Sequence, residues 1–123
     1  MPEHRKPTVV LVVEDDPGVL ATTLAMIEDG GLETIHATSS DEAVDILTSR
    51  NDIGIVLTDV EIPGTFSGFE LAAVIRENWP ATHVVVTSGV TPPDGRELPA
   101  GIPFLPKPYG QGALLERLRA RPA

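Results

Sequence analysis

The chain has 123 residues, a net charge of −9 and no cysteine, and 41% of its residues are hydrophobic. This length fits one compact domain, no apolar run approaches the roughly 20 residues that cross a bilayer, and the negative charge disfavours contact with a phosphate backbone, so we expect neither a membrane nor a nucleic-acid partner. Without cysteine or a secretory signal, the sequence indicates a cytoplasmic protein in which any metal is bound by oxygen ligands.

The N-terminal part of the chain predicts one strand followed by one helix. Residues 8–13 (TVVLVV) form a continuous apolar run rich in β-branched side chains, which is typical of a strand buried on both faces of a parallel sheet. Asp16 and Pro17 suit the N-cap and the first position of a helix, and an apolar helical pattern continues from there. Gly30 and the glycine after it end this helix.

The same alternation repeats in the middle of the chain. Residues 33–37 predict a second, more polar strand, and residues 39–42 (SSDE) form a capping box that begins a second helix. Residues 53–58 (IGIVLT) predict a third, buried strand that ends at Asp59. Residues 60–66 contain a Pro-Gly pair and predict a loop.

The C-terminal part continues the pattern with further strands and helices. Residues 67–70 (SGFE) form another capping box, and the helix that it begins ends before Pro80. Residues 83–87 (HVVVT) and 102–105 (IPFL) predict the fourth and fifth strands. Apolar spacing predicts a last helix over about residues 109–119.

A helix between the fourth and fifth strands is compromised by its composition. Residues 90–103 contain prolines at 92, 93, 99 and 103 and glycines at 95 and 101. Both residue types destabilise a helix interior, and Leu98 is the only large apolar residue between positions 91 and 101. We therefore predict a shortened or irregular fourth helix, and we expect partners to contact the first helix, the last helix or an unusual loop surface.

Strands that alternate with helices predict an α/β fold in which five parallel strands form a doubly wound sheet. Ligands of such folds bind beyond the carboxyl ends of the strands. The residues that follow or end the strands are Glu14 and Asp15, then Asp59, Ser88 and Lys107. The sequence therefore places three acids, a hydroxyl and a cation at one edge of the sheet.

Carboxylates that meet at this edge repel one another. At about 4 Å and an effective dielectric constant near 20, each like-charged pair costs on the order of 4 kcal/mol. A divalent cation relieves this repulsion, and all-oxygen ligands on short strand ends favour Mg²⁺. With Mg²⁺ and Lys107 the site is near neutral, so it can receive a phosphoryl group, and Asp59 is the carboxylate that we expect to accept it.

The same positions carry a family resemblance. Its motifs are Glu14-Asp15-Asp16 after the first strand, Asp59 with Pro63 four residues later, Thr87-Ser88-Gly89 after the fourth strand, and Phe104 three residues before Lys107-Pro108. In this order and spacing, over essentially its whole length, the chain resembles the receiver domains of bacterial response regulators. The resemblance implies the flavodoxin-like receiver fold and a function in two-component or phosphorelay signalling.

The resemblance also implies a role for each residue of the site. Asp59 would take a phosphoryl group from the phosphohistidine of a sensor histidine kinase or a histidine phosphotransfer protein, in a Mg²⁺-dependent reaction. Asp15 and Asp59 would bind Mg²⁺ directly, and Glu14 would act largely through water. The other implied roles are those of the Glu61 backbone carbonyl as a metal ligand, Ser88 and Lys107 as contacts of the phosphoryl oxygens, and Phe104 as a rotamer switch.

Two of these assignments leave an alternative open. Thr87 is also a hydroxyl residue, and a slip of one residue in register would put it in the place of Ser88. Phe104 is equally compatible with a side chain that only fills the core. The chain also departs from the family pattern, because the loop before Gly68 is one residue longer than in the commonest receivers and Ser67 stands where Asp is usual.

Three other functions fit this sequence less well. A nucleotide- or flavin-binding module needs a phosphate loop rich in Gly, Ser or Thr after the first strand, where this chain has acidic residues. A phosphatase-like hydrolase with an Asp nucleophile needs a cap over its substrate, for which the chain has no spare length. A pseudo-receiver that only makes protein contacts needs neither the acidic set nor Lys107.

We therefore expect residues 1–123 to be a single receiver domain with no output domain, which signals by contact with a downstream protein that the sequence does not identify. Such a domain catalyses only its own phosphorylation and dephosphorylation, so it is not an enzyme with an external substrate. A receiver excised from a longer hybrid kinase is the alternative that the sequence leaves open.

Overall fold

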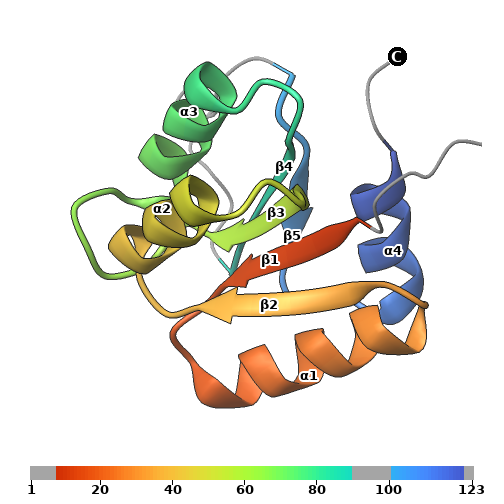
Figure 1. Cartoon of the computed structure of the whole chain (residues 1–123). Coiled ribbons are helices and arrows are strands. Elements are labelled where there is room, and N and C mark those ends of the chain that lie inside the picture. The colour runs from red at the N-terminus through yellow and green to blue at the C-terminus, as the bar shows by residue number, and fades with distance from the viewer. Residues whose placement is uncertain (1–7, 90–100, 121–123) are drawn as a thin grey trace, which may run out of the picture.

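The computed structural model describes residues 8–89 and 101–120. Its centre is a parallel five-stranded sheet in the order β2-β1-β3-β4-β5 (Figure 1). The strands are β1 (Val9–Val13), β2 (Glu33–Ala37), β3 (Ile53–Asp59), β4 (His83–Ser88) and β5 (Phe104–Pro106). This arrangement confirms the predicted α/β class and the doubly wound parallel sheet.

Helices cover both faces of the sheet. They are α1 (Pro17–Asp29), α2 (Ser40–Ser49), α3 (Gly68–Asn78) and α4 (Gln111–Arg119). Helices α1 and α4 lie against one face, and α2 and α3 lie against the other (Figure 1). None of the helices within the described residues is long and apolar enough to cross a membrane.

Strand β1 shows why the sequence forms a sheet that is buried on both faces. All five of its residues are buried, and its side chains alternate between the two halves of the core. Val10 and Val12 pack with residues of α1 and α4, whereas Leu11 and Val13 pack with residues of α2 and α3. The apolar run at residues 8–13 therefore forms a strand buried on both faces of the sheet, as the sequence predicted.

The predicted helix starts are largely confirmed. The Asp16 carboxylate caps α1 by accepting hydrogen bonds from the N–H groups of Gly18 and Val19, and the capping box of Ser67 and Glu70 is complete. The box predicted at the start of α2 is only half present. Ser39 accepts from the N–H of Glu42, but the Glu42 carboxylate accepts from the N–H of Thr38 at 2.8 Å.

Two boundaries near the C-terminus were predicted wrongly. Strand β5 spans Phe104–Pro106, because Ile102, which begins the predicted strand, is buried in the core without pairing in the sheet. The last helix begins at Gln111 with Gly110 as its N-cap, since Tyr109 lies in the preceding loop and packs on the core beside α1 and α4. The predicted irregularity of a helix over residues 90–100 lies outside the described residues.

Candidate functional site

Three strand ends bring two carboxylates and one ammonium together. Glu14 directly follows β1, Asp59 ends β3, and Lys107 follows β5. The Nζ atom of Lys107 lies 2.8 Å from Oδ2 of Asp59 and 3.0 Å from Oε1 of Glu14. The side chains of Glu14 and Asp59 are only 5% and 9% exposed, against 20% for Lys107. The cation therefore bridges two buried anions at the carboxyl edge of the sheet.

Backbone N–H groups hold the other oxygen of each carboxylate. Oε2 of Glu14 accepts a hydrogen bond from the N–H of Asp16 at 3.2 Å. Oδ1 of Asp59 accepts one from the N–H of Glu61 at 3.3 Å. Both donors lie in the loops that leave the strands, so the start of each loop helps to orient the acid that precedes it.

Burial and neighbouring charges shift the pKa values of this cluster. Burial raises the pKa of Glu14, and the nearby charge of Asp59 adds to this effect, so that together they outweigh the hydrogen bonds from Lys107 and Asp16. Burial alone would lower the pKa of Lys107, but its hydrogen bonds to Asp59 and Glu14 hold that pKa above its usual value. Lys107 is therefore a charged ammonium at neutral pH.

The remaining predicted site residues lie around this cluster. Asp15 and Glu61 are exposed, one after β1 and the other after β3. Ser88 is buried at the end of β4, and its carbonyl oxygen accepts a hydrogen bond from the N–H of Lys107 at 2.9 Å. Phe104 is partly buried and packs against the half of the core that contains α2 and α3, so its contacts fit either reading of this residue.

Thr87 carries a buried hydroxyl without a hydrogen-bond partner in the part of the chain that the structure describes. Thr87 is also the residue of β4 that pairs with Asp59 in the sheet. The side chains of Thr87 and Ser88 point to opposite faces, because neighbouring residues of a strand alternate. The two hydroxyls therefore lie on opposite faces of β4, and that of Thr87 is beside the strand that carries Asp59.

The sequence did not reveal the structural importance of Gly68. This glycine is the first residue of α3, and its N–H donates to the carbonyl oxygen of Val60 at 2.8 Å. A Cβ atom at position 68 would overlap the Asp59 carbonyl oxygen and would lie 2.6 Å from the Cα of Val60. Only the absence of a side chain lets α3 begin this close to Asp59.

Hydrogen bonds hold the loop between β3 and α3 to the start of α2. The Asp41 carboxylate accepts hydrogen bonds from the N–H and the hydroxyl of Thr65, at 3.1 and 2.8 Å. The Ser40 hydroxyl oxygen accepts one from the N–H of Phe66 at 2.9 Å, and the N–H of Ser40 donates to the Pro63 carbonyl at 2.9 Å. These contacts hold the loop between β3 and α3 against the start of α2.

The carboxylates of Glu14 and Asp59 suit a bound cation, since one ammonium nitrogen already lies within hydrogen-bond distance of both. Within residues 8–89 and 101–120, no three His, Asp or Glu side chains lie close enough together to hold a metal ion by themselves. Mg²⁺ is commonly bound by one or two carboxylates and keeps several waters. The donor set is therefore compatible with Mg²⁺, with Asp15 next to Glu14 as a further exposed carboxylate.

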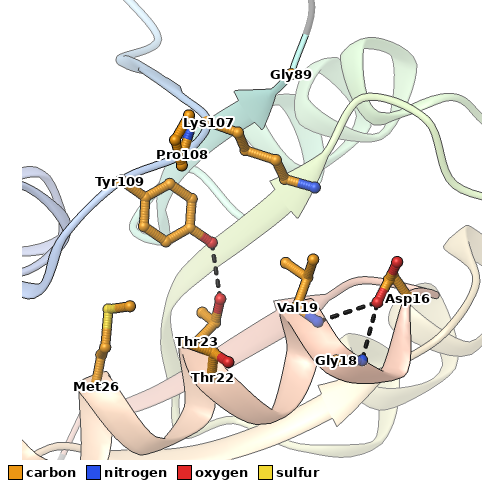
Figure 2. Close-up of a pocket in the computed structure, with 10 residues that line it drawn as sticks. All are labelled: Asp16, Gly18, Val19, Thr22, Thr23, Met26, Gly89, Lys107, Pro108 and Tyr109. Carbon is orange, nitrogen blue, oxygen red and sulfur yellow. Dashed lines mark hydrogen bonds between the residues drawn. The ribbon is translucent and has the colours of Figure 1, made fainter.

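A cavity of about 670 Å³ opens beside Lys107. Figure 2 shows the successive residues Lys107, Pro108 and Tyr109 on one side of it and helix α1 on the other. The lining residues of α1 include Val19, Thr22 and Met26. The cavity thus borders the cluster at Lys107.

Comparison with known proteins identifies the family to which the chain belongs. Residues 10–119 match the family described as response regulator receiver domain. The chain is 29% identical over 115 residues to the heme response regulator HssR of Staphylococcus saprophyticus, covering 92% of this chain and 50% of that protein. It is 32% identical over 107 residues to protein-glutamate methylesterase/protein-glutamine glutaminase 3 of Hahella chejuensis, covering 82% of this chain and 30% of that protein.

The fold has close counterparts among solved structures. One is a response regulator receiver protein from Sinorhizobium medicae, with a TM-score of 0.84, 23% identity and 92% coverage of each chain. At this identity the likeness supports the fold alone. The chain spans half or less of the length of the two curated relatives named above.

Proposed function

Because the chain belongs to the response regulator receiver domain family of two-component signal transduction, we propose that Asp59 accepts a phosphoryl group from a phosphohistidine of a histidine kinase or a histidine phosphotransfer protein. One observation supports this most strongly. Asp59 ends a central strand with its Oδ2 atom 2.8 Å from the Lys107 ammonium, so the carboxylate lies beside a cation that can balance the charge of an incoming phosphoryl group.

The proposed transfer is a single displacement at phosphorus. An oxygen of the Asp59 carboxylate forms a bond to phosphorus while the bond between phosphorus and the donor imidazole nitrogen breaks, and the imidazole keeps the electron pair. Lys107 and the Ser88 hydroxyl would contact the phosphoryl oxygens. The N–H of Glu61, 3.3 Å from Oδ1 of Asp59, orients the carboxylate for attack.

Receiver domains typically bind Mg²⁺, and we propose that Glu14, Asp15, Asp59 and the Glu61 carbonyl would hold this ion. The ion would neutralise charge on the phosphoryl oxygens. The residues of the chain would provide the acceptor oxygen, the ammonium and the hydroxyl. Because Mg²⁺ keeps several waters, an indirect role of Glu14 through water is compatible with this assignment.

We further propose that the phosphoryl group changes the contacts of Ser88 and thereby the rotamer of Phe104, which would signal to a downstream protein. The donor is expected to approach through the cavity between α1 and residues 107–109, since that cavity opens beside Lys107. Receiver domains typically act as phosphoacceptors rather than enzymes, and we expect this one to act in the cytoplasm.

Incubation with acetyl phosphate tests the proposed function. The protein with Mg²⁺ is expected to gain the mass of one phosphoryl group, and the protein with a chelator is expected to gain none. Intact-mass spectrometry measures the gain, and peptide mapping after borohydride reduction of the acyl phosphate locates it. A gain at a residue other than Asp59, or no gain with Mg²⁺ from either acetyl phosphate or a phosphorylated histidine kinase, would contradict the proposal.

Mg²⁺ is expected to stabilise the native protein. An ion that binds only the folded state adds about 2.7 kcal/mol at a concentration one hundred times its dissociation constant. Thermal unfolding with and without Mg²⁺ measures this as a rise in midpoint temperature, and Asp15→Ala is expected to reduce the rise and to stabilise the metal-free protein.

Asp45→Ala is the matched control for this experiment, because Asp45 is an exposed acid on α2. It removes the same charge and should retain the full response to Mg²⁺. If Asp15→Ala and Asp45→Ala respond alike, Asp15 does not belong to the metal site.

A further inference from the structure

Tyr109 connects the loop that carries Lys107 to helix α1. Its hydroxyl lies 2.8 Å from the hydroxyl of Thr23, and Figure 2 shows this contact spanning the gap between the loop and the helix. Thr23 is only 2% exposed, and the Tyr109 ring packs against the half of the core that contains α1 and α4. The contact is therefore a partly buried hydrogen bond between a core-packed ring and a buried helix residue.

This hydrogen bond joins the loop that carries Lys107 to the helix that follows Glu14. Tyr109 is two residues after Lys107, whereas α1 begins three residues after Glu14. The ammonium of Lys107 in turn bonds Glu14 and Asp59, at 3.0 and 2.8 Å. Helix α1 is thus connected to Lys107 twice. Thr23 bonds Tyr109, two residues after Lys107, and Glu14, three residues before α1, bonds the Lys107 ammonium.

The hydroxyl of Tyr109 is not needed for packing, since a phenylalanine ring would fill the same space. Burial raises the pKa of Tyr109, and its hydrogen bond with Thr23 opposes this rise. A buried hydroxyl is retained at a free-energy cost unless it finds a partner. Here that partner is Thr23 alone among the contacts described for Tyr109 in residues 8–89 and 101–120.

We propose that Tyr109 is a positioning residue, whose hydrogen bond to Thr23 holds Lys107 against Glu14 and Asp59. The inference deepens the proposed phosphoryl transfer, because it assigns the geometry of Lys107 to a contact outside the acidic cluster. Loss of this contact gives Lys107 more freedom, so that its ammonium spends less time beside Asp59. The protein still folds, but the maximal rate of phosphoryl transfer falls.

Chemical labelling of Lys107 tests the positioning without any phosphorylation. The chain has two lysines, Lys6 and Lys107, so Lys6 serves as an internal reference amine for an N-hydroxysuccinimide ester. Tyr109→Phe is expected to raise the rate of Lys107 labelling relative to Lys6 roughly three- to tenfold, the range of one neutral hydrogen bond. Peptide mass spectrometry gives the ratio, and an unchanged ratio would overturn the inference.

Matched variants separate the hydrogen bond from general loosening of the fold. Thr23→Val removes the partner hydroxyl and should reproduce the effect of Tyr109→Phe, with no further change in the double variant. Thr23→Ser keeps a hydroxyl and should restore the ratio of the original protein. Thr22→Val changes the neighbouring threonine of the same cavity and should leave the ratio unchanged. A failure of any of these four results would also overturn the inference.

Phosphorylation kinetics with acetyl phosphate and Mg²⁺ then test the consequence. Tyr109→Phe is expected to lower the maximal rate roughly three- to tenfold, with little change in the donor concentration that gives half of that rate. In a Lys107→Gln background, Tyr109→Phe should cause no further loss. An equal loss in both backgrounds would show that Tyr109 does not act through Lys107. If the unaltered protein takes up no phosphoryl group, the proposed function fails, while the labelling ratio still decides the positioning role.

Discussion

Asp59→Asn is expected to abolish phosphoryl uptake from acetyl phosphate, as measured by intact mass. The amide has nearly the shape of the carboxylate but lacks the anionic oxygen that attacks phosphorus. The fold should persist, because Lys107 keeps its contact with Glu14 at 3.0 Å when Asp59 is neutralised. We therefore expect full loss of the adduct in a protein with an unchanged circular dichroism spectrum.

Asp45→Asn is the control for this substitution. Asp45 lies exposed on α2, so the variant makes the same chemical change away from the cluster and should take up one phosphoryl group at the original rate. Persistence of the adduct in the Asp59→Asn protein would move the acceptor to another residue. Loss of the adduct in the Asp45→Asn protein would show that uptake depends on charge in general.

The features that sequence reasoning recovered depend on local patterns. The apolar run before Glu14 and the one before Asp59 are each long enough to define a buried strand, and parallel strands must bring their carboxyl ends to one edge. The meeting of Glu14 and Asp59 follows from these two facts. Their order in the sequence was sufficient for the prediction, although the bridging position of Lys107 required the structure.

The features that were missed depend on distances between segments far apart in the chain. The contact between Thr23 and Tyr109 joins residues separated by 86 positions, and neither residue belongs to a local pattern that predicts it. The start of the fifth strand was misplaced for a related reason. Ile102 is apolar and buried, as a strand residue would be, but it does not pair with β4. Its apolar character therefore led to a strand being predicted where there is only a buried side chain.

At Gly68 one feature was predicted from the sequence and another was missed. The capping box marked the start of α3 correctly, but no local pattern showed that this position requires glycine. That need comes from the backbone of Asp59 and Val60, which occupies the space of a Cβ atom. Neither neighbour can move aside as a flexible side chain would. The residue therefore links the start of α3 to the position of the proposed phosphoacceptor.

Gly68→Ala is accordingly expected to destabilise the protein by about 3 kcal/mol, at the upper end of the cost of overpacking, and to slow phosphorylation of Asp59 because the carbonyl group of Asp59 must shift. Urea unfolding measures the first effect and the initial rate with acetyl phosphate the second.

Gly112→Ala is the matched control, since Gly112 lies in the first turn of α4 and a Cβ there would have no neighbour within 4 Å. That variant should be unchanged in rate and more stable by about 0.5–1 kcal/mol. Equal stabilities for the two variants would mean that α3 can move away from Asp59 at little cost. The backbone of residues 59–60 would then not require glycine at position 68.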